Sequence, residues 1–205
     1  MHHPVSHHNT INSSFSKSCL SLGLTLLSLC LFSASVPALD IEGISFTDQV
    51  QIEGQQLQLN GAGLRSKFFV SVYVGGLYLS NKTAQVDEIL AMSGPKRVAM
   101  HFIYDKISES KIRGAWLEGF TDNNSEQVMA EIQPKIEAFN SFWPTIKGGD
   151  IALVDYLPGK GTQISLNGKV LGIVTGDKFH QAVLRIWLGD NPVDSDLKAG
   201  MLGSE

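Results

Sequence analysis

The chain has 205 residues, and its 16 Lys and Arg against 20 Asp and Glu give a net charge of −4 at neutral pH. This mild acidity excludes the strongly basic surface typical of nucleic-acid binding, and it gives no electrostatic reason to expect binding to an anionic membrane. Both cysteines, Cys19 and Cys30, lie in an N-terminal leader. The remainder of the chain therefore has neither a disulfide nor a thiol nucleophile.

Residues 1–38 have the pattern of a secretory signal peptide. Lys17 precedes an apolar run over 19–32, and small residues follow up to Ala38. We expect cleavage after Ala38 and export, in a bacterium to the periplasm; a retained N-terminal anchor is the alternative. Residues 39–205 then have the length of a single domain, and we expect no membrane span in them.

Arg65 stands at the head of the longest strand that the sequence predicts. Gly61-Ala62-Gly63 predicts a turn before it, and residues 68–79 alternate apolar side chains with the period of a half-buried strand. If extended geometry begins near Arg65, its guanidinium, the Ser71 hydroxyl and the Tyr73 phenol share one face. That face would form the floor of a cleft with a polar rim.

Strands flank a helical middle in the rest of the chain. Asn167-Gly168, between two alternating segments, is a strong hairpin signal, and Gly75-Gly76 predicts a bulge or a close approach by another segment. Segregated strands and helices predict an α+β fold, in which helices cover one face of an antiparallel sheet. We expect short strands over 41–46, 50–52 and 57–59, later strands over 97–104, 151–157, 162–166 and 169–174, and helices over 83–92, 108–120, 125–139 and 177–188.

The helix ends carry signals of their own. Thr83, Ser125 and Asp177 are suited to capping the first turn of a helix, and Gly189 is suited to ending one. Pro134 falls inside the longest predicted helix, where it should kink the helix or divide it in two.

Two histidines, His101 and His180, lie outside the leader. His101 falls in a predicted strand, on the side opposite its apolar residues, and is either a structural histidine or a haem ligand. His180 lies in the first turns of a polar-faced helix, and we expect it to be solvated. One histidine alone makes no metal site, so no metal is predicted.

The segment from Gly61 to Arg65, followed by residues 72–79, resembles the chalcone isomerase superfamily, and most of all its bacterial secreted branch. The helix around 116–120, the late hairpin and residues 187–193 match in the same order, so the resemblance spans nearly all of residues 39–205. It implies an open-faced β-sandwich, in which a helical layer covers a large antiparallel sheet and a ligand cleft lies between them.

The resemblance also implies two possible roles for Arg65. In the plant enzymes, the matching arginine polarises a chalcone carbonyl and stabilises the developing enolate during closure to a flavanone. In non-enzymatic relatives it holds the carboxylate of a fatty acid, and some fungal relatives bind haem. Two departures disfavour catalysis: Tyr73 stands where the enzymes commonly carry threonine, and the helix over 108–119 lacks their tyrosine, which leaves Tyr104 as the nearest candidate.

The leading hypothesis is an exported, non-catalytic protein that binds a small apolar acid, similar to a fatty acid. Arg65 would hold the carboxylate, with Ser71, Tyr73 and Tyr104 beside it. The first alternative is an isomerase acting on a polyphenol-like chalcone, with Arg65 as its catalytic residue. The second is a haem-binding protein with His101 as a ligand. No cofactor is required by the leading hypothesis, and the oligomeric state does not follow from the sequence.

Overall fold

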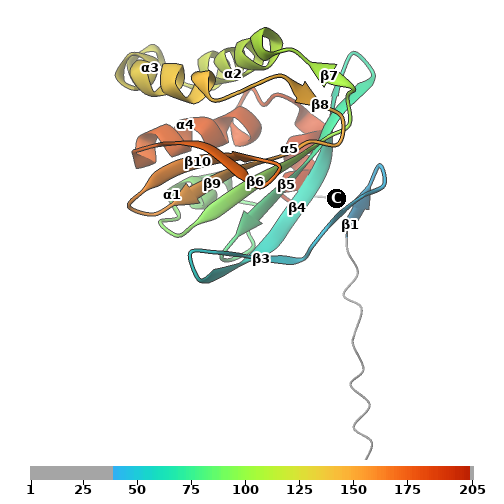
Figure 1. Ribbon diagram of the computed structural model, residues 1–205. Helices are drawn as coiled ribbons and strands as arrows, with labels where there is room; N and C mark the ends of the chain where they lie inside the picture. Colours follow the sequence, from blue (N-terminus) through green and yellow to red (C-terminus); the bar gives the residue numbers. More distant parts are fainter. Residues whose placement is uncertain (1–38, 204–205) are drawn as a thin grey trace, which may run out of the picture. The chain divides into compact units, whose positions relative to one another are not determined.

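The computed structural model describes residues 39–203, which pack as one unit; the predicted signal peptide lies outside this range. Within it, seven strands form an antiparallel sheet of order β11-β10-β9-β6-β5-β4-β3 (Figure 1). Strands that follow one another within this sheet are neighbours throughout, and α2 and α3 lie between β6 and β9 in the sequence. The strands are β3 (Gln49–Ile52), β4 (Gln55–Lys67), β5 (Val70–Leu79), β6 (Lys96–Phe102), β9 (Ile151–Leu157), β10 (Gly161–Leu166) and β11 (Lys169–Val174).

Helices cover one face of this sheet, so the predicted α+β architecture is confirmed. Figure 1 shows α4 against the sheet, with α2 and α3 on its outer side, while α5 packs against β4. A small hairpin of β1 (Leu39–Ile41) and β2 (Ile44–Phe46) lies beside β4, and β7 (Lys106–Ile107) pairs with β8 (Ile146–Lys147). The helices are α1 (Val86–Ala91), α2 (Glu109–Asn123), α3 (Glu126–Ser141), α4 (Asp177–Leu188) and α5 (Ser195–Met201).

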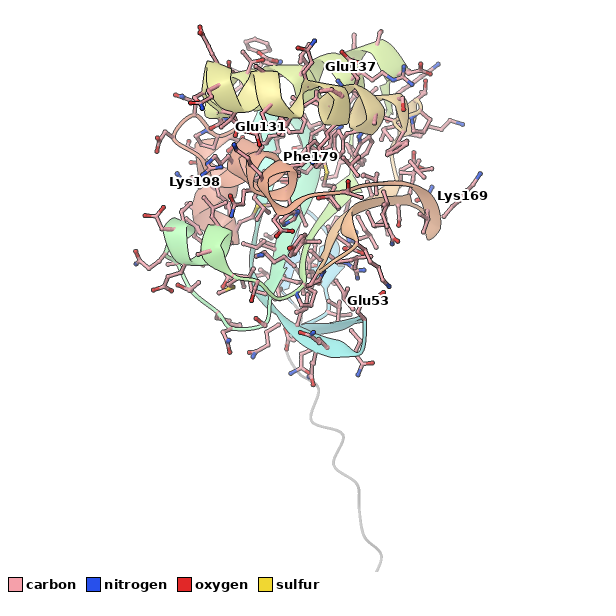
Figure 2. The ribbon with its side chains drawn as sticks, turned by 90° about the vertical axis from the view of Figure 1, so that its left-hand side faces the viewer. Glu53, Glu131, Glu137, Lys169, Phe179 and Lys198 are labelled. Carbon is pink, nitrogen blue, oxygen red and sulfur yellow. The ribbon has the colours of Figure 1, made fainter. Side chains whose placement is uncertain are left out.

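Aromatic side chains fill the space between the sheet and the helices. Phe179 of α4, labelled in Figure 2, packs against Phe120 and Phe139, with ring centroids 5.7 Å apart in both pairs. Trp116 of α2 meets Trp187 of α4 edge-on, with centroids 5.5 Å apart. This arrangement is the one that aromatic pairs prefer, and it makes the helix-facing core largely solid.

The predicted turn at Gly61-Ala62-Gly63 is wrong, because β4 continues through these residues to Lys67. The glycines instead allow α5 to approach the sheet. A Cβ atom on Gly61 would lie 2.1 Å from the carbonyl oxygen of Gly200, and one on Gly63 would lie 2.9 Å from the Cα of Leu197. The turn into β5 is made by the two residues that follow Lys67.

Gly75-Gly76 marks a close approach, which was one of the two predicted roles. A Cβ on Gly75 would lie 2.7 Å from the Met201 side chain, and one on Gly76 would lie 2.6 Å from the ring of Phe46. The two glycines therefore allow Met201 and Phe46 to pack closely against opposite faces of β5 at adjacent positions.

Most of the predicted boundaries hold, with three exceptions. Asp177 does not cap α4, because Gly176 takes the N-cap position and the Asp177 carboxylate accepts a hydrogen bond from the Tyr156 hydroxyl. Ser125 caps α3 by accepting a hydrogen bond from the Val128 amide, and Gly189 ends α4. Thr83 instead accepts from the Gln85 amide, in a turn before α1, and does not cap the helix. α3 also runs through Pro134 as a single helix, so its division in two is wrong. Burial of the apolar face of α3 offsets the backbone hydrogen bond that proline removes.

His180 is buried, which contradicts the predicted solvated position. Its ring stacks on Tyr156 with centroids 4.4 Å apart, and its Nδ1 lies 3.2 Å from the Thr162 hydroxyl. Burial, with a smaller effect of the nearby Lys96 charge, lowers the pKa of His180 to about 3. His180 therefore lies in the core, while Asp177 and Lys178 on the same helix are exposed.

Among residues 39–203, no helix combines the length and the apolar character needed to cross a bilayer.

Candidate functional site

Arg65 and Tyr73 face each other across β4 and β5. They are partners in the strand register, so their side chains share one face, and the guanidinium carbon lies 5.5 Å from the centre of the tyrosine ring. Within residues 39–203, Arg65 forms no ion pair or side-chain hydrogen bond, and its Nε is buried without a partner. A buried charged donor without an acceptor is costly, which makes this arginine a candidate for binding an anion.

A β-bulge next to Arg65 decides which β5 residues share its face. Arg65 pairs with Tyr73 and Ser66 pairs with Ser71, so Val72 is the additional residue on β5. The Val72 carbonyl accepts hydrogen bonds from the backbone of the segment after β6. Because the bulge breaks simple alternation, Val72 lines the space beside Arg65 and Ser71 does not.

Arg65 lines a small inner cavity of about 20 Å³. This volume is sufficient for one oxygen-sized group. Tyr73, Trp116 and Trp187 also line it, and the buried Trp116 Nε1 has no hydrogen-bond partner in the described part of the chain. Two nitrogen donors around the same cavity therefore lack an acceptor.

The Tyr73 hydroxyl can supply a third donor. It accepts a hydrogen bond of 2.8 Å from the Trp187 Nε1, which leaves its own hydrogen available. Burial raises the pKa of Tyr73, while the Arg65 charge opposes that shift. The phenol is therefore protonated at neutral pH and can donate to a bound oxygen.

An outer groove of about 580 Å³ begins at Arg65 and lies between the β4–β5 hairpin and α2. Its volume falls in the range of about 300–1,000 Å³ found for small-molecule sites. Tyr104 lies along this groove, so the structure brings it together with Arg65, and its part in binding a ligand stays a prediction. The other side chains along the groove are Lys67, Phe68, Val70, Val72, Ile107, Lys111, Ala115 and Glu118.

His101 lies on the opposite face of the sheet from Arg65. Its ring packs against Phe46, with centroids 4.8 Å apart, beside the β1–β2 hairpin. Burial lowers its pKa, which favours the neutral ring. Within residues 39–203, no group of three or more His, Cys, Asp or Glu side chains is arranged to hold a metal ion.

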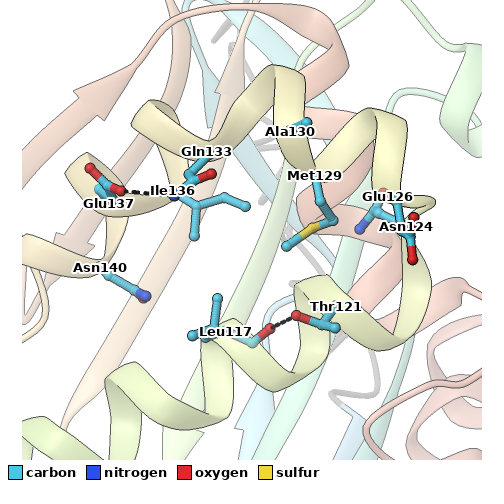
Figure 3. A pocket seen from close by; sticks show the side chains of 10 residues that line it. All are labelled: Leu117, Thr121, Asn124, Glu126, Met129, Ala130, Gln133, Ile136, Glu137 and Asn140. Atoms are coloured by element: carbon cyan, nitrogen blue, oxygen red, sulfur yellow. Dashed lines mark hydrogen bonds between the residues drawn. The ribbon is translucent and has the colours of Figure 1, made fainter.

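A second groove, of about 520 Å³, runs between α2 and α3 (Figure 3). Its floor carries Leu117, Met129 and Ile136, while Glu126 and Glu137 lie along its rim. No lysine or arginine lines it, so it offers an acid no counter-charge. The groove at Arg65 is therefore the better candidate for an anionic ligand.

Sequence reasoning missed the two tryptophans as polar groups. The sequence indicates Trp116 only as core or apolar lining, whereas its unpartnered Nε1 adds a donor to the inner cavity. Trp187 positions the Tyr73 hydroxyl. The useful signal was helical spacing: Ile112 and Trp116 are four residues apart in α2, and both line the cavity.

A profile of the family described as "Chalcone isomerase-like" matches residues 38–203. Among curated proteins, none matches the sequence. Among solved structures, a fatty-acid binding protein of Arabidopsis thaliana is similar, with a TM-score of 0.62 over 82% of this chain and 97% of that one. The two sequences are 16% identical, and at this level the likeness shows a shared fold.

Proposed function

This chain belongs to the chalcone isomerase-like family, and we propose that it binds a small apolar acid without transforming it. Arg65 holds the carboxylate in this proposal, and the apolar tail lies in the outer groove. The supporting observation is the set of unpartnered donors around the inner cavity: the Nε of Arg65 and the Nε1 of Trp116.

A carboxylate suits these donors chemically. One of its oxygens fits the inner cavity, where it accepts from the Trp116 indole and the Tyr73 hydroxyl, while the guanidinium spans both oxygens. Binding would satisfy two buried nitrogens that have no acceptor within the described part of the chain. The gain is large because charge-assisted hydrogen bonds are stronger away from water.

The outer groove suits the tail of such an acid. Val70, Val72 and Ile107 supply apolar walls, and Tyr104 adds an aromatic surface that is 44% exposed. The inner cavity beyond Arg65 holds only about 20 Å³, so the tail runs outward along α2. The similar Arabidopsis structure is that of a fatty-acid binding protein, which agrees with a ligand of this kind.

Export is part of the same proposal. The pattern of residues 1–38 supports secretion into a bacterial periplasm. Expression of the full chain in a bacterium, followed by intact-mass measurement of the periplasmic fraction, tests it. We expect the loss of residues 1–38; a full-length mass in the membrane fraction would instead indicate a retained anchor.

Lipid extraction from the purified protein and mass spectrometry test the ligand class. We expect a co-purified fatty acid, and Arg65→Ala to weaken rebinding of the delipidated protein by about tenfold or more, because a charged hydrogen-bond pair is lost. Quenching of the fluorescence of Trp116 and Trp187 provides the readout. Lys169→Ala is the control, since it removes an exposed cation from the edge strand β11 (Figure 2), which four strands separate from β4 in the sheet.

Two outcomes contradict this proposal. Equal affinity in the wild type and Arg65→Ala would remove the carboxylate anchor. Chalcone turnover above the buffer rate, abolished by Arg65→Ala, would identify the chain as an isomerase, because the same donors can stabilise an enolate oxygen.

A further inference from the structure

Four two-residue hairpin turns connect strands in the described part of the chain, and one differs in composition. At all four, both central residues have positive φ, as in a type I′ turn. Three of them place glycine second: Glu42-Gly43, Glu53-Gly54 and Asn167-Gly168. The β4–β5 turn uses Phe68 and Phe69, with φ of +52° and +65°.

Phe68-Phe69 is unfavourable for the fold in two ways. Positive φ strains a residue with a bulky side chain, and here two such residues are adjacent. Their side chains are also 85% and 106% exposed, so they gain no burial within the fold that would offset the strain. A strained and exposed aromatic pair points to a role outside the folded chain.

The surroundings of this tip are apolar and locally basic. Tyr104 and Val70 are exposed beside it, and Phe68 forms part of the wall of the outer groove. Four exposed lysines stand around the same end of the molecule: Lys67, Lys106, Lys111 and Lys147. The carboxylates there are Asp105, Glu118 and Glu109, the last of which pairs with Arg113 at 3.0 Å.

We propose that the Phe68-Phe69 tip inserts into the interface of a phospholipid bilayer. Aromatic side chains partition to the boundary between headgroups and acyl chains, and lysines nearby meet the phosphates. The insertion is driven by the two phenylalanines more than by charge, because carboxylates partly balance the lysines and the whole chain is acidic. We therefore expect the tip to insert into uncharged bilayers as well.

A bilayer suits this tip better than a protein partner does. A stable protein interface buries about 800 Å² on each side, whereas the unusual feature here is two residues at the end of a hairpin. A narrow, convex tip can enter a soft interface without a matching pocket. Lipid phosphates also pair with the lysine ammonium groups, which an apolar pocket in a protein would leave unpaired.

Insertion would also place the groove at the bilayer surface. Phe68 and Lys67 lie along the groove whose inner end is Arg65. An apolar acid could then pass between the bilayer and the groove without crossing water. This consequence depends on the proposed ligand, but the docking itself does not.

Co-sedimentation with vesicles tests the docking directly. The protein from residue 39 onward, which packs as one unit with its own core, avoids a contribution from the apolar leader. The vesicles are phosphatidylcholine alone, or phosphatidylcholine mixed with phosphatidylglycerol, both free of fatty acid. The variant Phe68→Asn/Phe69→Gly gives the tip the residues that a type I′ turn prefers, so it should fold at least as well.

We expect the wild type to bind both kinds of vesicle, and the Asn-Gly variant to lose about tenfold or more in partitioning, since burial of two aromatic rings is lost. Val170→Ser/Ile173→Ser removes two exposed apolar side chains from β11 and should bind as the wild type does. Arg65→Ala should also bind normally, which separates docking from ligand binding.

Three results would overturn the docking proposal. The first is wild-type protein that stays in the supernatant with both kinds of vesicle. The second is equal binding by the wild type and the Asn-Gly variant. The third is a dimer that sedimentation velocity detects in the wild type alone, which would assign the tip to a second copy of the chain.

Discussion

The two halves of β4 differ in what covers them. Gly61 and Gly63 lie directly beneath α5, at distances that leave no room for a side chain. Arg65, two residues further along, lines both the inner cavity and the outer groove. One strand therefore passes from a closed region into an open one within five residues.

Asp194 marks the border between the two regions. Its carboxylate accepts from the amides of Asp196 and Leu197, which starts α5, and from the Ser66 amide at 2.9 Å, which fixes that start to β4. The helix then runs over the glycines and not over Arg65. The difference shows that an open site can result from where a covering helix begins.

A methyl group on Gly61 should break the closed region, and this is the largest effect that we expect. Gly61→Ala places its Cβ against the backbone of α5, which cannot move without separating from the sheet. We expect a loss of about 3 kcal/mol or more in the free energy of unfolding, measured by urea denaturation.

Gly114→Ala is the matched control for this substitution. Gly114 lies on α2, and no atom of residues 39–203 outside its own helix turn comes within 4 Å of the position that a Cβ would take. Replacing an exposed helical glycine should stabilise the chain by about 0.5–1 kcal/mol. If both variants unfold at the same urea concentration, the glycines of β4 are not what admits α5.

His180 and Arg65 extend the comparison to unpaired nitrogens. The Nε2 of His180 and the Nε of Arg65 are both buried and have no hydrogen-bond partner among residues 39–203. His180 is enclosed by the core, whereas Arg65 borders open space. We therefore expect the enclosed His180 ring to stay unprotonated, and the Arg65 guanidinium beside the groove to bind an anion.

Acid should therefore destabilise the fold through His180. In the unfolded chain, His180 takes up a proton near pH 6.5, whereas in the folded chain its ring stays neutral down to about pH 3. Stability attributable to this residue is thus complete above pH 6.5 and is lost as the pH falls toward 3, by on the order of 5 kcal/mol.

Urea denaturation at a series of pH values measures this loss. His180→Gln should flatten the dependence between pH 6.5 and 3. His101→Gln should change it less, because His101 is only half-buried and its pKa is lowered by burial alone. A steeper loss of stability in His180→Gln than in the wild type would be inconsistent with a neutral, buried ring.

The sequence predicted the fold well because hydrophobic periodicity and turn chemistry are local signals. Asn167-Gly168 and the cap at Ser125 were found in this way. The role of Gly61 was not found, since glycine is equally typical of a turn and of a close approach. Only the position of α5, more than a hundred residues away along the chain, distinguishes the two.

The candidate site was predicted only in part, because some of its residues are placed by contacts that no local sequence signal indicates. Arg65 and Tyr73 share a face because they are register partners on β4 and β5, whereas the sequence predicted that face from alternation along one continuous strand. The prediction placed Ser71 on the wrong face, because the bulge at Val72 shifts the alternation and no local sequence pattern indicates it. Burial of His180 likewise depends on Tyr156 and Thr162, which come from other elements.

Ser71 and Val70 provide the finest test of the border between the two regions. Val70 lines the outer groove, whereas the neighbouring Ser71 does not. Val70→Ser should weaken binding of the apolar acid a few-fold, because part of the apolar wall is lost. Ser71→Ala should leave affinity unchanged, although it removes a hydroxyl one position away. Equal losses in both variants would mean that β5 presents Ser71 to the ligand, and that the bulge does not set the face of the site; titration of tryptophan fluorescence separates the two cases.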